Sequence, residues 1–347
     1  MNKPLVSIII PFFNKVELLV EMIDCIRIQT YEKWELFLVD DGSTEETTNA
    51  IYNYIKNDKR ICLLKRNRPP KNGDTCRNIG YSQAHGKYVM FFDADDLISN
   101  TCIESRVMYM EANEDCDYAS FPYKTFYDGT SPNSALNKRK VKQLSNKELL
   151  KKLLKNDYPF TVWSNIYRRE SLQLIQWDEN VYVYQDFDYM IQCVLYGLRF
   201  RYADALECDY YYRLFYKGNN VSGNFTDSKK CDSTLYLFDK IYNQLETHPD
   251  SSYYREIFKE YFIIHLYRLL LSNNDKEIQK FIKTSEACYG TLFSQKLNKV
   301  YIKWKEKQHI VKLYFIMAIE FGNRRFFNYW IHSVAKQLLK KQVQPYK

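Results

Sequence analysis

Three aspartates follow an apolar stretch near residue 90. Residues 88–92 read YVMFF, and Asp93, Asp95 and Asp96 occupy three of the next four positions. Neighbouring carboxylates repel one another and lose hydration when buried, unless a positive group lies between them. Their hard oxygen ligands suit Mg²⁺ or Mn²⁺, which in turn bind diphosphate oxygens. The pattern therefore predicts a divalent-cation site for a diphosphate substrate, although three carboxylates after a strand are also typical of a solvated turn.

The elements that position these aspartates alternate between strand and helix. Amphipathic or capped helices are predicted from Val16 to Ile28, after Ser43 or Thr44, and through Ile79. This alternation predicts a doubly wound, mostly parallel α/β sheet, whose ligands bind beyond the carboxyl ends of the strands. Polar or aromatic residues follow three strands and should converge on one crevice, although an isolated Asp-Asp-Gly-Ser is more often a turn and helix cap. The predicted strands are 6–10, 34–39, 61–64 and 88–92.

The pattern changes after about Asp117. A helix is predicted from Ser145 to Leu154, with Ser145 and Glu148 forming a capping box, and another near 188–196. After about Lys229 only helical periodicity remains. We therefore expect an α/β domain over 1–225 and a helical region over 226–347. The strands predicted between residues 117 and 229 are 118–126, 160–168 and 200–213.

Composition excludes several other classes of protein. The nine cysteines contain no C-x-x-C pair and the five histidines are scattered, so we expect reduced thiols and no zinc site. No stretch has the length of a membrane span, and the N-terminus does not resemble a signal peptide. The net charge of +8 is modest, and the basic residues are not clustered in the N-terminal half, which argues against a nucleic-acid partner. We expect a cytoplasmic protein.

Five motifs follow one another along the first 170 residues. They are VSIIIPFFN at 6–14, VDDGST at 39–44, CRNIG at 76–80 with AHGKY at 84–88, FDADD at 92–96 and WSNIYRR at 163–169. In this order they resemble the family 2 glycosyltransferases, which have a Rossmann-like GT-A fold, and nothing similar is found in 230–347. The resemblance implies a metal-dependent, inverting enzyme that moves a hexosyl or N-acetylhexosaminyl group from a nucleoside-diphosphate sugar, with UDP favoured. The expected acceptor is a hydroxyl of a glycan or lipid-linked glycan in surface-polysaccharide synthesis.

The resemblance also implies which residues bind the donor. Asp41 would accept the N3–H of uracil, and Arg77 would either neutralise Asp41 or reach the nucleotide. Asp95 would contact Mn²⁺ or Mg²⁺ directly, while Asp93 would bind the same metal or hydrogen-bond ribose or sugar. Arg213 or a nearby lysine, Lys217, would clamp the diphosphate when a loop closes. The other positions expected at the nucleotide are Pro11, Phe12, Phe13, Asn14, Asn72 and Ala94, with Pro11 and Phe13 against the base and ribose.

The family usually carries Glu-Asp before a helix, where this sequence reads Gln185-Asp186. The resemblance makes Asp186 the general base of a single inverting displacement, with Asp188 as a rival. Replacing the first carboxylate by Gln185 should lower the pKa of the base slightly, because a like charge is removed. Trp163, Asn165 and Gln185 are expected near the acceptor, although the first two residues would equally suit packing of the sheet.

The last 27 residues, 321–347, contain no Asp or Glu and six Lys or Arg, with apolar residues at helical spacing. Such a helix, over 323–347, is compatible with an anionic membrane surface, and equally with packing on the preceding helices or with a homo-oligomer. Two other functions stay open from sequence. One is a nucleotidyltransferase acting on sugar phosphates, which usually needs a glycine-rich loop missing here, and the other is a non-catalytic nucleotide-sugar-binding protein.

Overall fold

The computed structural model describes residues 3–132, 142–215, 227–307 and 309–322, together with 326 and 328. The chain forms two compact units, Met1–Gly223 and Asn224–Lys347. Over the described ranges, no helix combines the length and apolar character needed to cross a membrane. Lys217 lies outside the described residues, as does the segment 323–347 apart from 326 and 328.

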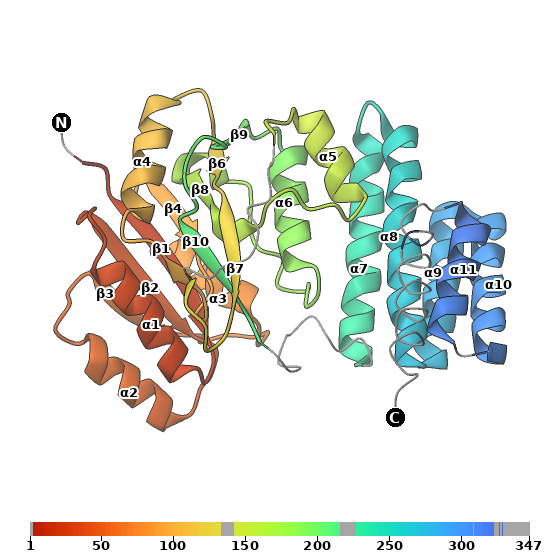
Figure 1. Ribbon diagram of the computed structural model, residues 1–347, viewed down its shortest axis with the longest axis horizontal. Coiled ribbons are helices and arrows are strands. Elements are labelled where there is room, and N and C mark those ends of the chain that lie inside the picture. Colours follow the sequence, from red (N-terminus) through yellow and green to blue (C-terminus); the bar gives the residue numbers. More distant parts are fainter. Residues whose placement is uncertain are drawn as a thin grey trace, which may run out of the picture. The chain divides into compact units, whose positions relative to one another are not determined.

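The first unit is built on a seven-stranded sheet in the order β3-β2-β1-β4-β8-β6-β9 (Figure 1). Its first four strands in the chain run parallel, as predicted, and the apolar residues of β1, β2 and β4 are almost all buried, whereas those of the edge strand β3 are partly exposed. Continuous apolar strands of this kind need cover on both faces. The strands are β1 (Val6–Phe12), β2 (Trp34–Asp40), β3 (Ile61–Lys65) and β4 (Tyr88–Phe91).

Helices cover both faces of this parallel half. The apolar sides of α1 (Val16–Arg27) and α2 (Glu45–Ile55) join Ile8 and Ile10 in one core cluster. On the opposite face α3 (Gly73–Ser82) lies so close to β1 that a Cβ at Gly80 would come 2.5 Å from Cγ2 of Ile9. Glycine at this position lets α3 approach β1, and α3 carries Arg77 at the carboxyl ends of the strands.

The other half of the sheet is mixed. Strand β8 (Asn165–Arg168) runs antiparallel to both β4 and β6 (Tyr118–Ser120), and β9 (Phe200–Tyr202) is parallel to β6. The strand predicted over 160–168 is therefore wrong in its first part, because a 3₁₀ turn, Val162–Ser164, precedes β8. Helices α4 (Cys102–Ala112), α5 (Asn146–Leu154) and α6 (Gln185–Leu195) complete the unit, and α5 begins with the predicted Ser145–Glu148 capping box.

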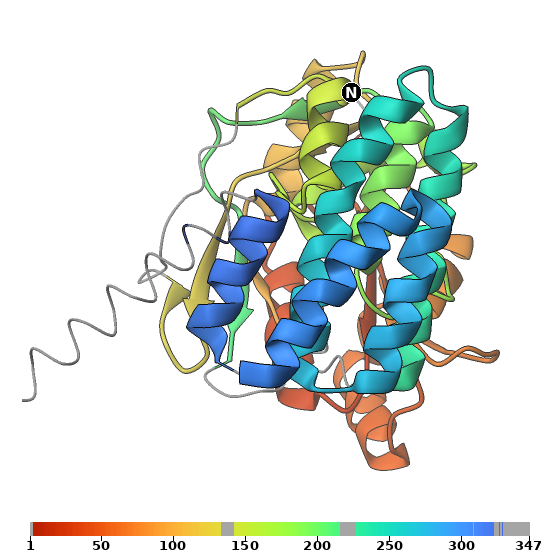
Figure 2. The same ribbon diagram turned by 90° about the vertical axis from the view of Figure 1, so that its right-hand side faces the viewer.

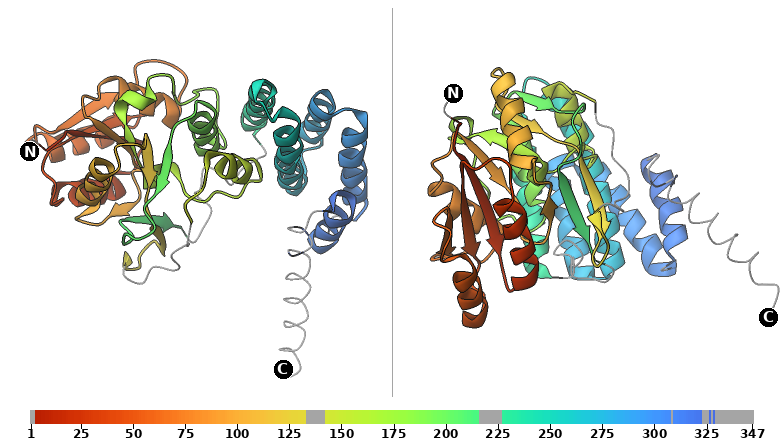
Figure 3. Two further views of the ribbon diagram at one scale, coloured as in Figure 1. Left: turned by 90° about the horizontal axis from the view of Figure 1, so that it is seen from above. Right: turned by 60° about the vertical axis from the view of Figure 1, so that its left-hand side comes forward.

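A second, three-stranded sheet has the order β5-β10-β7, and Figure 3 shows β7 and β10, in yellow and green, side by side. It contains β5 (Leu97–Ile98), β7 (Tyr123–Tyr127) and β10 (Tyr210–Leu214). Two sequence predictions are corrected here, because 118–126 and 200–213 each divide between the two sheets. Pro122 interrupts the first, since proline lacks the N–H that a ladder requires.

The second unit is helical, as the sequence predicted. Its helices lie side by side in Figure 2, and α9 contacts α7, α8 and α10. Aromatic side chains fill its centre, where Phe238 contacts Phe258, Phe262 and Phe281. The helices are α7 (Ser228–Gln244), α8 (Ser251–Ser272), α9 (Asp275–Tyr289), α10 (Thr291–Lys307) and α11 (Ile310–Phe321).

Candidate active site

The carboxylate of Asp96, the last of the three aspartates after β4, faces inward. It is 1% exposed and accepts hydrogen bonds from Tyr210 Oη at 2.8 Å and the backbone N–H of Arg213 at 2.7 Å. Burial raises the pKa of Asp96 well above its usual value, and Asp93 and Asp95 add to this rise. Asp96 therefore joins the end of β4 to β10 and is not a ligand-binding group.

Asp93 and Asp95 each meet a cation. Oδ1 of Asp93 accepts a hydrogen bond from Nη2 of Arg77 at 2.9 Å, and Asp95 forms an ion pair with Lys15. The side chains of Lys15 and Asp95 are 43% and 22% exposed, so this pair is accessible to solvent. Positive charge beside the aspartates, which the sequence required, is thus supplied by the chain itself.

The donor set around Asp95 fits a hard divalent cation. The Lys15 ammonium occupies one side of the Asp95 carboxylate, which marks a place where positive charge is accommodated. Among the described residues no three His, Cys, Asp or Glu side chains converge on a closed metal site. Mg²⁺ and Mn²⁺ sites commonly use one or two carboxylates and complete their shell with water and substrate phosphate. Asp95 and Asp93 are suited to that kind of open site.

Arg77 connects the groups of the site. Its guanidinium donates to Asp74 Oδ1 and Asp93 Oδ1, both at 2.9 Å, and lies 4.4 Å from the ring centre of Trp177. The expected pairing of Arg77 with Asp41 is wrong, because Asp41 accepts a hydrogen bond from Nε of Arg66 at 2.6 Å. Helix α3 places Arg77 beside β4, whereas Arg66 follows β3, the neighbour of β2.

Asp186 lies in the first turn of α6. Tyr184, the N-cap residue just before the helix, has a left-handed conformation with φ of 64°. Burial raises the pKa of Asp186 to about 6, with Arg77 lowering it and Asp93 raising it further. Within the described chain its carboxylate accepts no hydrogen bond, so both oxygens are available to a substrate. Asp188, the rival base, is buried and accepts a hydrogen bond from Gln192 at 2.8 Å.

The sequence analysis did not predict Asp74, a buried acid beside the half-buried Asp186. Its side chain is 1% exposed, and its Oδ2 atom has no hydrogen-bond partner in the part of the chain that the structure describes. Burial raises the pKa of Asp74 to about 8, against the lowering effect of Arg77, while Asp186 raises it and the nearby Gln185 amide lowers it. The acid that Gln185 lacks is thus replaced by one on α3. The sequence did contain one signal for it. Asp74 lies three residues before Arg77, a spacing that brings two side chains together on one helix.

Several residues expected at the nucleotide lie at the ends of β1 and β2. Phe13 is 44% exposed, and the Lys71 ammonium lies 3.6 Å from its ring centre. Asn14 has a left-handed φ of 50°, and its Oδ1 accepts from the backbone N–H of Thr44 at 3.0 Å. Asn14 therefore fixes the β1 end against the turn that follows β2, next to Asp41.

Three other residues expected at the nucleotide have side chains that make contacts within the protein. Phe12 and Ala94 are 3% and 6% exposed and belong to the hydrophobic core, so a nucleotide contact at these two positions would have to use the backbone. Asn72 is the N-cap of α3: its Oδ1 accepts from the backbone N–H of Thr75 at 2.8 Å, and its Nδ2 donates to the carbonyl of Glu179 at 2.6 Å. Through these bonds the Asn72 side chain caps α3 and ties it to the backbone at Glu179.

Trp163 and Asn165, expected at the acceptor, and Arg213, expected at the diphosphate, are buried, whereas Gln185 is partly exposed. Trp163 is 6% exposed and Asn165 is fully buried, where its amide donates to Tyr167 at 2.7 Å, so the packing alternative holds for both. Arg213 lies in β10, not in a loop, and its guanidinium is held by Glu21, Asp128 and the Asp95 carbonyl. Through these contacts Arg213 stabilises the backbone of the turn that carries Asp95.

Similarity to known proteins decides the family. Residues 7–175 match the family model described as glycosyl transferase family 2. An uncharacterized glycosyltransferase of Methanocaldococcus jannaschii, MJ1057, is 31% identical over 203 residues, which are 58% of this chain and 68% of that protein. The chain belongs to glycosyltransferase family 2. It spans 17% and 45% of the length of two other uncharacterized glycosyltransferases that it matches.

Solved structures share the GT-A fold of this family 2 glycosyltransferase. S. aureus TarS 1-349 in complex with UDP-GlcNAc has a TM-score of 0.66 at 16% identity, with 88% of this chain and 92% of that chain covered. The mannosyltransferase PcManGT from Pyrobaculum calidifontis, in complex with GDP-Man and Mn²⁺, has a TM-score of 0.53 at 17% identity over 92% and 87% of the two chains.

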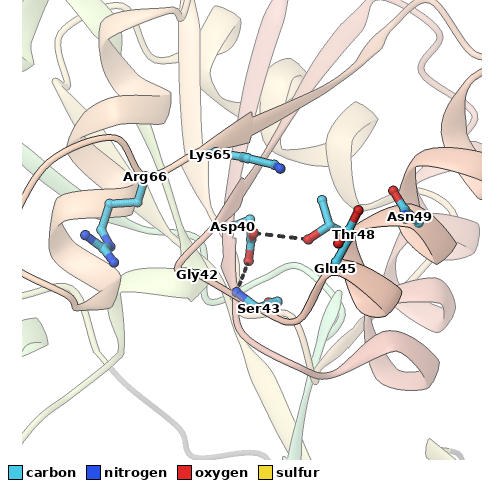
Figure 4. Close-up of a pocket in the computed structure, with 8 residues that line it drawn as sticks. All are labelled: Asp40, Gly42, Ser43, Glu45, Thr48, Asn49, Lys65 and Arg66. Atoms are coloured by element: carbon cyan, nitrogen blue, oxygen red, sulfur yellow. Dashed lines mark hydrogen bonds between the residues drawn. The ribbon is translucent and has the colours of Figure 1, made fainter.

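A hollow of about 350 Å³ in the glycosyltransferase is lined by Arg66, the partner of Asp41, among other residues. Figure 4 shows the side chains that line it. Asp40 points into it, where its carboxylate accepts from the backbone N–H of Ser43 at 2.8 Å and the hydroxyl of Thr48 at 3.3 Å. Asp93, Asp95 and Asp186 do not line it. The hollow therefore adjoins the candidate site on the β3 side and does not contain the reacting groups.

Proposed function

We propose that this glycosyltransferase moves a sugar from a nucleoside-diphosphate sugar, UDP-linked, to a hydroxyl of a glycan or lipid-linked glycan. One observation carries the proposal: Arg77 contacts Asp93 and lies close to Asp186, so the carboxylates after β4 and the half-buried acid of α6 share one cation. Carboxylates from separate elements then face a common space, in which a diphosphate leaving group and an acceptor hydroxyl have to meet.

The nucleotide is assigned to the ends of β1 and β2. Asp41 is an acceptor for the N3–H of uracil, with Arg66 keeping that carboxylate oriented. Pro11 and the exposed ring of Phe13 supply apolar cover for the base and ribose. The choice of UDP is supported by this acceptor and by the UDP-GlcNAc in the TarS complex.

Asp95, with Asp93, is assigned to hold Mn²⁺ or Mg²⁺ together with the diphosphate oxygens. When bound, such an ion stabilises the negative charge that develops on the departing nucleoside diphosphate. Lys15 would release Asp95 and remain close enough to the diphosphate for its ammonium to contribute positive charge. The Mn²⁺ in the PcManGT complex supports this assignment.

Asp186 is assigned as the general base. Its carboxylate accepts the proton of the acceptor hydroxyl while the acceptor oxygen forms a bond to the anomeric carbon. The bond from that carbon to the diphosphate oxygen breaks, and its electrons leave with the nucleoside diphosphate, so the configuration inverts. A pKa of about 6 keeps Asp186 ionised at neutral pH yet makes it a stronger base than an ordinary aspartate.

The proposal is tested in two steps. A thermal-shift comparison of UDP, UDP-GlcNAc, GDP and GDP-Man, each with Mn²⁺, identifies the nucleotide, and sugar release or transfer is then measured. Asp186→Asn should bind the donor as well as the unaltered enzyme and lose transfer by at least about 100-fold. Asp232→Asn, at an exposed aspartate of the helical unit, is the matched control and should change neither. Equal loss of donor binding and transfer in Asp186→Asn, or no loss of transfer, would reject the role as base.

A further inference from the structure

Strand β10 runs directly along the aspartates that follow β4. Tyr210 Oη donates to Asp96 Oδ2 at 2.8 Å and accepts from the backbone N–H of Asp93 at 3.4 Å. At the other end of the strand, Nε of Arg213 donates to the carbonyl of Asp95 at 2.6 Å. Tyr212 lies between these two fixed points, so its backbone is held against the metal-binding turn.

The ring of Tyr212 is fixed by an aromatic stack. Its centre lies 5.1 Å from that of Trp163, with 6° between the planes, and Tyr210 stacks on the same indole at 4.5 Å and 16°. Tyr123 meets Trp163 edge-on at 4.6 Å. Residues i and i+2 of a strand share one face, and the shared indole shows that Tyr210 and Tyr212 do so here. A side chain held in this way is pre-organised for binding.

The Tyr212 hydroxyl has no hydrogen-bond partner among the described residues, and the side chain is half-buried. Burial raises the pKa of this phenol, and Asp96, Asp93, Asp95 and Asp186 raise it further, which places all four carboxylates nearby. At neutral pH the phenol is uncharged and can both donate and accept a hydrogen bond. A preordered neutral hydroxyl thus lies close to both the metal-binding aspartates and the base.

We propose that the Tyr212 hydroxyl binds the sugar unit that is being transferred. This inference rests on the function proposed above. In an inverting displacement the anomeric carbon lies between the leaving diphosphate and the base, so the transferred sugar is the part of the substrate that must lie near both Asp95 and Asp186. A neutral phenol on a rigid aromatic stack offers a sugar hydroxyl one hydrogen bond and an apolar edge, and in this way restricts which sugar fits.

The chain supplies a matched control in the adjacent residue. Tyr211 is also half-buried in β10, but it lies on the opposite face, near Cys208 and Asp209 and away from the site carboxylates. Tyr212→Phe keeps the ring on Trp163 and removes one oxygen, and Tyr211→Phe makes the same chemical change outside the site. Both variants should melt within about 2 °C of the unaltered enzyme, which is below the shift expected for 1 kcal/mol.

The experiment measures the affinity of each variant for UDP and for UDP-GlcNAc with Mn²⁺, and for GDP and GDP-Man if the unaltered enzyme prefers guanine. Tyr212→Phe should bind the nucleotide sugar about three- to tenfold more weakly, as for loss of one hydrogen bond, and bind the free nucleotide within about twofold of normal. Tyr211→Phe should leave both affinities unchanged.

Other outcomes overturn the inference in distinguishable ways. Equal weakening of nucleotide and nucleotide-sugar binding in Tyr212→Phe would assign the hydroxyl to the diphosphate. Unchanged affinity for both would mean that the hydroxyl does not reach the sugar, and loss in Tyr211→Phe as well would indicate a general effect on β10. If the unaltered enzyme binds none of these ligands, the proposed function itself fails, and this inference fails with it.

Discussion

The pH dependence of transfer tests the assignment of Asp186 most quantitatively. Burial raises the pKa of its carboxyl to about 6, and the base works only when ionised. With that pKa, about 90% of the enzyme is active at pH 7 and about 10% at pH 5, so kcat/KM should fall about tenfold between them. An unshifted aspartate would stay mostly ionised, and kcat/KM would fall by less than about 1.2-fold.

The assay should follow initial rates of transfer from pH 4.5 to 8 with Mn²⁺ saturating at each pH. The kcat/KM profile reports groups of the free enzyme, and a nucleotide sugar has no group that titrates near pH 6. Asp74→Asn is the control, because Asp74, with a pKa of about 8, is already protonated over the acidic part of the profile in which Asp186 titrates. The control should keep the midpoint near 6. A midpoint near 4 in the unaltered enzyme would refute the buried environment described for Asp186, and a flat profile would refute its role as base.

Three further predictions concern stability and metal binding. Because the folded pKa of Asp74, about 8, lies above the unfolded value of 3.8, the unfolded state releases this proton first, and stability should fall as pH rises from about 4 to about 8. Urea titrations should show that the free energy of unfolding falls by at least about 2 kcal/mol less over this pH range in Asp74→Asn than in the unaltered enzyme. The same dependence on pH in both proteins would contradict the prediction. The buried Arg106 forms an ion pair with Asp209 at 2.8 Å. Asp209→Ala leaves this guanidinium without its carboxylate partner and should lower the free energy of unfolding by about 3–5 kcal/mol. An unchanged denaturation curve would contradict this stabilising role of the ion pair. Lys15→Ala removes the ammonium that competes for Asp95, so calorimetry without nucleotide should show about two- to fivefold tighter Mn²⁺ binding; unchanged affinity would mean that Lys15 and the ion do not share a place.

The parallel half of the fold follows from local sequence. The apolar stretches of β1, β2 and β4 are nearly continuous because both faces of these strands are buried. Such a stretch, followed by a segment with helical periodicity, is typical of a parallel strand joined to a covering helix. From β6 onward the strands have three to five residues and run in both directions. Their partners are distant in sequence, so periodicity alone merged β6 with β7, despite the interruption at Pro122, and merged β9 with β10.

The candidate site divides in a similar way. The positions of Asp93, Asp95 and Asp186 follow from motifs that end a strand or begin a helix. The partner of Asp41 could not be predicted from a motif, because Arg66 reaches Asp41 only through the pairing of β2 with β3. Trp163 begins the motif at 163–169, and the resemblance implied either an acceptor contact or packing of the sheet. Its burial could not be predicted locally, because the rings that stack on it come from β10, which is distant in sequence.

In the proposed function, one nucleotide sugar contacts Asp41, Asp95 and Asp186 together. A crystal structure with Mn²⁺ and an unreactive analogue of the preferred nucleotide sugar would show these contacts. We expect the base against Asp41, the metal and diphosphate at Asp95, and the anomeric carbon facing Asp186. A nucleotide bound instead in the hollow beside Arg66 (Figure 4), or an anomeric carbon turned away from Asp186, would contradict it.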